Sequence, residues 1–119
     1  MFITVILVDI PYLWARMDFH KAFFANVQKS PLFVRYVPAA IVYILFAYGL
    51  TYVALPSASS LLSAACRGAV VGGVMYGFYD ATNMATLLGW TWEMAITDTL
   101  WGATAGAIAT SIVYSLLKK

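Results

Sequence analysis

Three aspartates lie within stretches of the chain that are otherwise apolar. An ionised side chain at the centre of a membrane helix costs roughly 2.5–3.5 kcal/mol on insertion scales, so such residues normally face a protein interior or a water-filled cavity. A hydrogen-bond donor follows each aspartate three residues later, which places donor and acid on one helix face. We therefore predict an intramembrane polar cluster consisting of Asp9, Tyr12, Asp80, Asn83, Asp98 and Trp101.

Asp80 and Asp98 lie symmetrically about Gly89. If Gly89 is the turn of an antiparallel helix pair, the two carboxyl groups sit at similar depth. Two adjacent carboxyls do not both ionise readily, so the pair could share a proton, relay one or hold a cation. The alternative is that the acids join helices through interhelical hydrogen bonds, each of which stabilises a membrane bundle by about 0.6–2 kcal/mol.

The sequence carries no pattern for nucleophilic catalysis, phosphate binding or metal ligation. It has no G-x-S-x-G, no H-E-x-x-H and no phosphate-binding glycine loop. Cys66 and His20 are the single cysteine and the single histidine, so one chain cannot form a Cys/His metal site. We expect no catalytic residue, metal or cofactor. We expect His20 in a solvated loop, and the alternative is that His20 and Lys21 bind anionic headgroups or a partner.

The segments that carry the acids are long and apolar. The chain is 63% hydrophobic and 10% charged, whereas about a quarter of the residues in a soluble domain are charged, so its solvent is expected to be a lipid bilayer. The net charge of +2 is too small to indicate nucleic-acid binding. A membrane helix needs about 20 apolar residues. We predict helices at about residues 2–24, 36–55, 61–88 and 92–117.

The first predicted helix is the weakest of these spans. It contains Pro11 and turns polar from Arg16, so it is expected to be short, kinked or continued along the membrane surface. Ser57 or Ser60 could cap the third helix. The connections leave no room for a soluble domain. The predicted fold is one all-α domain, residues 1–119, embedded in the membrane as a bundle of about four transmembrane helices.

Trp90 and Trp92 flank the turn at Gly89. Tryptophan is enriched where a membrane meets water, because its ring is apolar and its N–H is a donor. Both residues are therefore expected in the aromatic belt at one membrane surface.

Glycines recur at four-residue intervals on the last two helices. This spacing lets helix backbones approach closely in lipid. We favour packing of the two helices within one chain, and the alternative is contact between copies in a homo-oligomer. The glycines are Gly68, Gly72, Gly73 and Gly77, followed by Gly102 and Gly106.

A long run near the centre resembles a known family. Residues 76–87 read Y-G-F-Y-D-A-T-N-M-A-T-L, and Trp90 and D-T-L-W-G at 98–102 follow. This run resembles the DUF2177 family of predicted membrane proteins, whose members show Y-G-x-Y-D-x-T-N-x-A-T-L, a tryptophan and D-x-x-W-G. Members also have L-D-x-x-W-L in the first helix, where residues 8–13 here read V-D-I-P-Y-L after a shorter apolar lead. The resemblance implies a four-helix membrane protein and no particular activity.

Three functional hypotheses fit these observations. The first is a structural or assembly protein that organises a larger complex in a bacterial, organelle or virion membrane, with other subunits or copies of itself as partners. The second is a small proton- or ion-coupled transporter that uses the aspartates. The third is an intramembrane enzyme that acts on lipid. The short loops and the missing catalytic motif favour the first.

Overall fold

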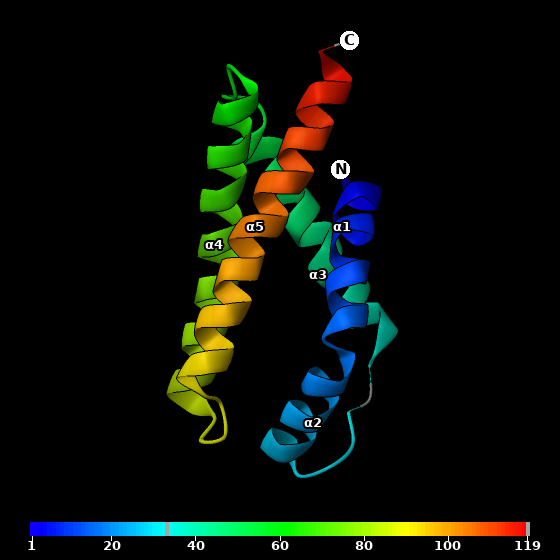
Figure 1. Ribbon diagram of the computed structural model, residues 1–119, viewed down its shortest axis with the longest axis vertical. Helices are drawn as coiled ribbons and strands as arrows, with labels where there is room; N and C mark the ends of the chain where they lie inside the picture. The colour runs from blue at the N-terminus through cyan, green and yellow to red at the C-terminus, as the bar shows by residue number, and fades with distance from the viewer. Residues whose placement is uncertain (33, 119) are drawn as a thin grey trace.

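The computed structural model describes residues 1–32 and 34–118, and these form helices without any strand (Figure 1). This confirms the all-α fold. The helices are α1 (Phe2–Ala15), α2 (Met17–Gln28), α3 (Tyr36–Gly49), its π-helical continuation η1 (Leu50–Ala54), α4 (Leu61–Thr86) and α5 (Trp92–Leu117).

Three helical stretches in the described residues are long and apolar enough to cross a membrane. They are α3 with η1, α4, and α5, whereas α1 is a shorter apolar helix. At 1.5 Å per residue, the 14 residues of α1 reach about 21 Å, less than the roughly 30 Å of a bilayer core. The structure thus confirms a membrane bundle with a short first helix.

The predicted first helix, residues 2–24, is in fact two helices. The break falls at Arg16, whose φ and ψ of −106° and 11° leave the helical region, and not at Pro11, which lies inside α1. Proline is tolerated in a membrane helix where its surroundings satisfy the freed backbone groups. The chain instead turns where the apolar run ends, and α2 ends at Gln28, before Lys29 with φ 60°.

Hydroxyl side chains cap the two longest helices. The Ser60 hydroxyl accepts a hydrogen bond from the backbone N–H of Ser63 at 3.0 Å, so Ser60 rather than Ser57 caps α4. The Thr91 hydroxyl accepts from the N–H of Met94 at 3.1 Å and caps α5. The predicted third helix, residues 61–88, ends two residues early, because the tight turn before Thr91 begins at Leu87.

The α4–α5 pair is the closest contact in the molecule, and the two helices run antiparallel side by side (Figure 1). A Cβ atom added to Gly72 would overlap the carbonyl oxygen of Gly102, and one added to Gly68 would overlap that of Gly106. Only glycine leaves room for backbones to meet in this way. These four glycines pack α4 against α5 within one chain.

The other two glycines on α4 have more space. A Cβ on Gly73 would lie 3.6 Å from the Cβ of Ala103, and one on Gly77 would lie 3.5 Å from Thr99. Both distances are ordinary van der Waals contacts, so these positions face α5 without requiring glycine.

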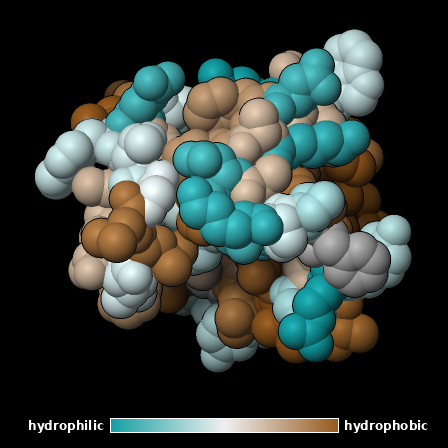
Figure 2. Space-filling model, turned by 90° about the horizontal axis from the view of Figure 1, so that it is seen from below, coloured by the Kyte–Doolittle hydropathy of each residue, from teal (hydrophilic) through white to brown (hydrophobic). Residues whose placement is uncertain are grey.

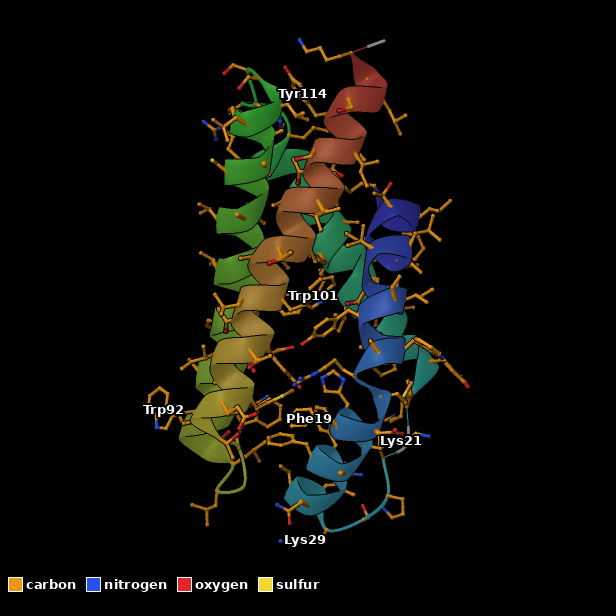
Figure 3. The ribbon with its side chains drawn as sticks, in the orientation of Figure 1. Phe19, Lys21, Lys29, Trp92, Trp101 and Tyr114 are labelled. Carbon is orange, nitrogen blue, oxygen red and sulfur yellow. The ribbon has the colours of Figure 1, made fainter. Side chains whose placement is uncertain are left out.

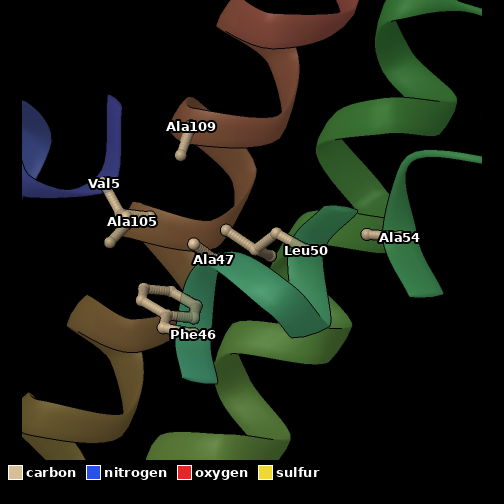
Figure 4. Close-up of a cluster of buried hydrophobic side chains, with 7 residues drawn as sticks. All are labelled: Val5, Phe46, Ala47, Leu50, Ala54, Ala105 and Ala109. Atoms are coloured by element: carbon tan, nitrogen blue, oxygen red, sulfur yellow. The ribbon is translucent and has the colours of Figure 1, made fainter. Parts of the chain in front are cut away.

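Two apolar clusters attach the remaining helices to this pair. In the first, Val5 of α1 and residues of α3 and η1 pack on small side chains of α5 (Figure 4). Its buried members are Val5, Phe46, Ala47, Leu50, Ala54, Ala105 and Ala109. In the second, Trp90, Met94 and Ala95 contact Phe19, Phe23 and Phe24 of α2.

The end of the molecule that carries α2 is amphipathic. Figure 2 views it from below: hydrophilic side chains gather over the centre and upper part of the view, and hydrophobic ones lie mainly at its left, right and lower parts. Large apolar side chains along the helices, such as Val37, Leu62 and Phe78, are exposed. A bilayer around the sides of the bundle would cover them.

Replacing Gly72 by alanine should destabilise the protein, because the added methyl group forces two backbones apart. Overpacking of this kind costs about 1–3 kcal/mol or more. The free energy of unfolding in detergent micelles measures the effect. Gly73→Ala is the matched control, since it makes the same change one position along with only ordinary contacts. Equal effects of the two substitutions would contradict the close packing at Gly72.

Candidate functional site

Asp9 is a buried acid that joins three helices. Its Oδ2 accepts a hydrogen bond from the Tyr43 hydroxyl on α3, and its Oδ1 accepts one of 2.8 Å from Trp101 Nε1 on α5. Two donors compensate much of the free energy needed to bury a carboxylate. We call a buried aspartate with its hydrogen-bond donors a node. The Asp9 node therefore holds the short helix α1 to the bundle, together with the packing of Val5.

Tyr12 has a different role from the predicted one. It makes no hydrogen bond to Asp9, and its ring stacks on the indole of Trp101 with centroids 4.2 Å apart and planes 6° from parallel. Trp101 in turn donates to Asp9, as described above, and not to Asp98. The structure thus brings Asp9, Tyr12 and Trp101 together. The hydrogen-bond donors to Asp9, however, come from α3 and α5 and not from Tyr12 on its own helix.

Asp80 and Asp98 do meet across the α4–α5 pair, and their carboxyl groups lie within hydrogen-bonding reach of each other. Asp80 is 1% exposed. Its Oδ1 accepts a hydrogen bond of 3.3 Å from Trp90 Nε1, and its Oδ2 accepts one of 3.4 Å from the Thr99 hydroxyl. A hydrogen bond between two carboxyls requires a proton on one of them, so this pair can hold a proton.

Asn83 takes no part in this node. It lies beside Tyr79, on its own helix, and makes no hydrogen bond to Asp80. Asn83 and Tyr79 are spaced by one helical turn, which brings their side chains together.

The predicted belt position of Trp90 is wrong. Trp90 is 4% exposed and donates to Asp80, whereas Trp92 is 73% exposed. Trp90 turns inward because the non-helical segment Leu87–Thr91 folds its ring under the bundle, between Phe23, Phe24 and Tyr79.

A groove runs along the outer face of α4 and α5, and Asp80 lies at its base. Its volume is about 550 Å³. Apart from Asp80 and Thr99, the lining is apolar. The lining residues are Gly77, Asp80, Ala81, Met84 and Ala85 of α4, with Trp92, Ala95, Ile96, Thr99 and Leu100 of α5.

The corner between α1 and α2 holds two further polar side chains, Arg16 and His20. The Arg16 guanidinium lies over the ring of Phe19, with its carbon 4.2 Å from the ring centroid, and its buried Nε has no partner in the described residues. His20 is buried in α2 among Tyr12, Phe19 and Phe24, and so is not in a solvated loop. Burial lowers the pKa of His20 below its ordinary 6.5, and the charge of Arg16 lowers it further, while Asp9 acts against both.

No group of three or more His, Cys, Asp or Glu side chains that could hold a metal occurs in residues 1–32 and 34–118. The acids pair with aromatic and hydroxyl donors instead, as the hydrogen bonds of Asp9 and Asp80 illustrate. Such an arrangement can fix helices or hold a proton.

Sequence reasoning missed Tyr43 and Thr99, which complete the two nodes, and placed Trp90 at the membrane surface. The sequence does contain a signal for Thr99, because it follows Asp98 on the predicted antiparallel partner of Asp80. No comparable signal exists for Tyr43, because its depth relative to Asp9 depends on how α1 and α3 are aligned.

The apolar helices, the buried acids and the lipid-exposed faces define a small integral membrane protein. The model of the family described as "Predicted membrane protein (DUF2177)" matches residues 1–115. The chain belongs to the DUF2177 family. No curated protein and no solved structure matches it.

Tyr43→Phe should destabilise the bundle by about 1–2 kcal/mol, because it removes a donor to a buried carboxylate. The free energy of unfolding in micelles checks this. Tyr48→Phe is the matched control, since Tyr48 lies on the same helix and is exposed. The Tyr43 effect should disappear in an Asp9→Ala background, and an unchanged effect there would contradict the node.

His20 should make stability depend on pH. Its folded-state pKa lies below 6.5, so the unfolded chain binds the proton more readily. The contribution of His20 to the free energy of unfolding is complete above about pH 6.5. It decreases as the pH falls from there through the folded-state pKa, and it is constant at lower pH. Unfolding free energies between about pH 7.5 and 5.5 measure the slope.

His20→Gln is the control, because it removes the titrating ring while keeping a polar side chain. Most of the slope in this window should vanish with it. The ring signals of this single histidine in an NMR titration give the pKa directly. A midpoint at or above 6.5 would contradict burial of the ring.

Proposed function

We propose that this protein is a structural or assembly subunit that anchors or organises a larger membrane-associated complex, such as one in an organelle or virion membrane. The observation that carries the proposal is the use of the buried acids. Asp9 and Asp80 accept hydrogen bonds from donors on the chain's own helices and turn. Acids bound in this way stabilise a rigid bundle rather than waiting for a substrate.

The outer surface supports the same proposal. The loops between the helices are short, so the contacts available to partners lie chiefly on helix faces. Those faces carry large exposed apolar side chains, including Tyr48 and Tyr52, whose rings pair on the outside of α3 and η1. In the hydrocarbon core of a membrane, helices of different proteins associate through close packing of such faces and through interhelical hydrogen bonds.

A second candidate is a small proton- or ion-coupled transporter. The observation that favours it is the contact between the Asp80 and Asp98 carboxyls beside a groove. A transporter needs such a pair to change its protonation in each cycle, whereas a clamp needs it to stay fixed. Proton flux into liposomes that contain the purified protein separates the two, since a carrier loses flux in Asp80→Asn/Asp98→Asn and a subunit never shows it.

If the proposal is correct, the chain extracted from its native membrane in a mild detergent should migrate as part of a larger complex. Cross-linking in the intact membrane before extraction should trap the same neighbours. The reason is that a bundle rigid enough to organise an assembly keeps its helix-face contacts when lipid is replaced gently. Native gels and mass spectrometry of the cross-linked bands make the measurement.

The control is the same chain made alone in a foreign membrane, which should migrate as a small particle. Migration of the native protein as a lone monomer, with no reproducible cross-linked partner, would contradict an assembly role.

A further inference from the structure

We infer that the groove on α4 and α5 docks a transmembrane helix of a different membrane protein, one that carries a single lysine or arginine at the depth of Asp80. The inference rests on the proposed assembly function and gives its partner a stated chemistry. It is drawn from the shape of the groove, from the charge at its base and from the symmetry that a dimer of this chain would have.

The shape suits a helix. Gly77, Ala81 and Ala85 recur at four-residue intervals on α4 and line one wall of the groove. Residues at this spacing share a helix face, and small residues there let a neighbouring backbone approach closely. On the other wall Trp92 and Leu100 are exposed, and Trp92 points away from the bundle in Figure 3.

The acidic side chains at the base of the groove favour a partner that carries a cation. In the described residues, the polar groups that act on the Asp80 and Asp98 carboxyls are each other, the carboxyl of Asp9, an indole and a hydroxyl, and none is basic. The two hydrogen bonds to Asp80, at 3.3 and 3.4 Å, are long for their types. A carboxylate accepts about four hydrogen bonds, so Asp80, which lines the groove, has capacity for a further donor.

A basic residue on the partner would gain from the same contact. A lysine or arginine in the middle of a membrane helix is as unfavourable as an aspartate. Pairing the two offsets part of both penalties, and a charge-assisted hydrogen bond is about twice as strong as a neutral one. The small α4 wall allows the partner's backbone to lie close enough for a long basic side chain to reach the base.

A second copy of this chain fits the groove poorly. Two copies in one membrane are related by a two-fold axis along the membrane normal, which places residues of equal depth opposite each other. Asp80 would then face the Asp80 of its partner, and two acids in contact disfavour each other. A lipid chain could lie in the groove but offers nothing to the carboxyls.

The test uses a synthetic transmembrane peptide rich in leucine and alanine with one central lysine, and the same peptide with leucine in its place. The full chain, labelled at the exposed Cys66, is reconstituted in nanodiscs, and energy transfer to the labelled peptide reports binding. The lysine peptide should bind at least about tenfold more tightly than the leucine peptide, as expected for a charge-assisted hydrogen bond.

Two variants locate the contact. Asp80→Asn should abolish the preference for lysine. Ala81→Leu fills the groove from an exposed position and should weaken binding of the lysine peptide about tenfold. Ala40→Leu, the same change at an exposed site on α3, should have no effect. If Asp80→Asn does not fold, the difference in lysine-peptide binding between Ala81→Leu and Ala40→Leu decides whether the groove is the binding site.

Equal binding of the two peptides to the unmodified chain would overturn the inference. So would loss of energy transfer between two labelled copies in Ala81→Leu, which would make a second copy the occupant. A native complex that survives Ala81→Leu would also overturn the groove as the docking site while leaving the assembly function in place. Absence of any native complex would instead overturn the assembly function itself.

Discussion

The contact of α4 with α5 through glycine is the constraint on which the rest of the structure depends. At Gly68, Gly72, Gly102 and Gly106 the backbones meet with no side chain between them. Such a contact restricts sliding and rotation, because a carbonyl oxygen of one helix lies where a side chain of the other would otherwise be. It therefore fixes the depth of every residue on one helix relative to the other.

The polar groups follow from this alignment. Once the pair is fixed, Asp80 and Asp98 meet, and the turn folds Trp90 inward as a donor. The same rigid pair presents Trp101 to Asp9, so α1 is positioned by an acid that α5 and α3 both satisfy. Because a buried acid without donors is unfavourable in lipid, these hydrogen bonds also select one arrangement of the helices over others.

The two faces of α4–α5 then differ in what they offer. The inner face is filled by aromatic and small apolar side chains from α1, α2 and α3. The outer face keeps a groove with an acid at its base. Asp80 therefore both accepts hydrogen bonds that stabilise the bundle and lines the groove.

The sequence by itself determined the class of protein, the long apolar helices, the glycine pairing and the approach of Asp80 to Asp98. These depend on length, composition and symmetry about Gly89, which are local properties of two helices joined by a tight turn. Only the tertiary structure decided that Tyr43 binds Asp9, that the chain breaks at Arg16 and that His20 is buried. Those features depend on which helix faces meet, and in lipid the helix surfaces are apolar all round, so hydrophobic periodicity does not mark the inward face.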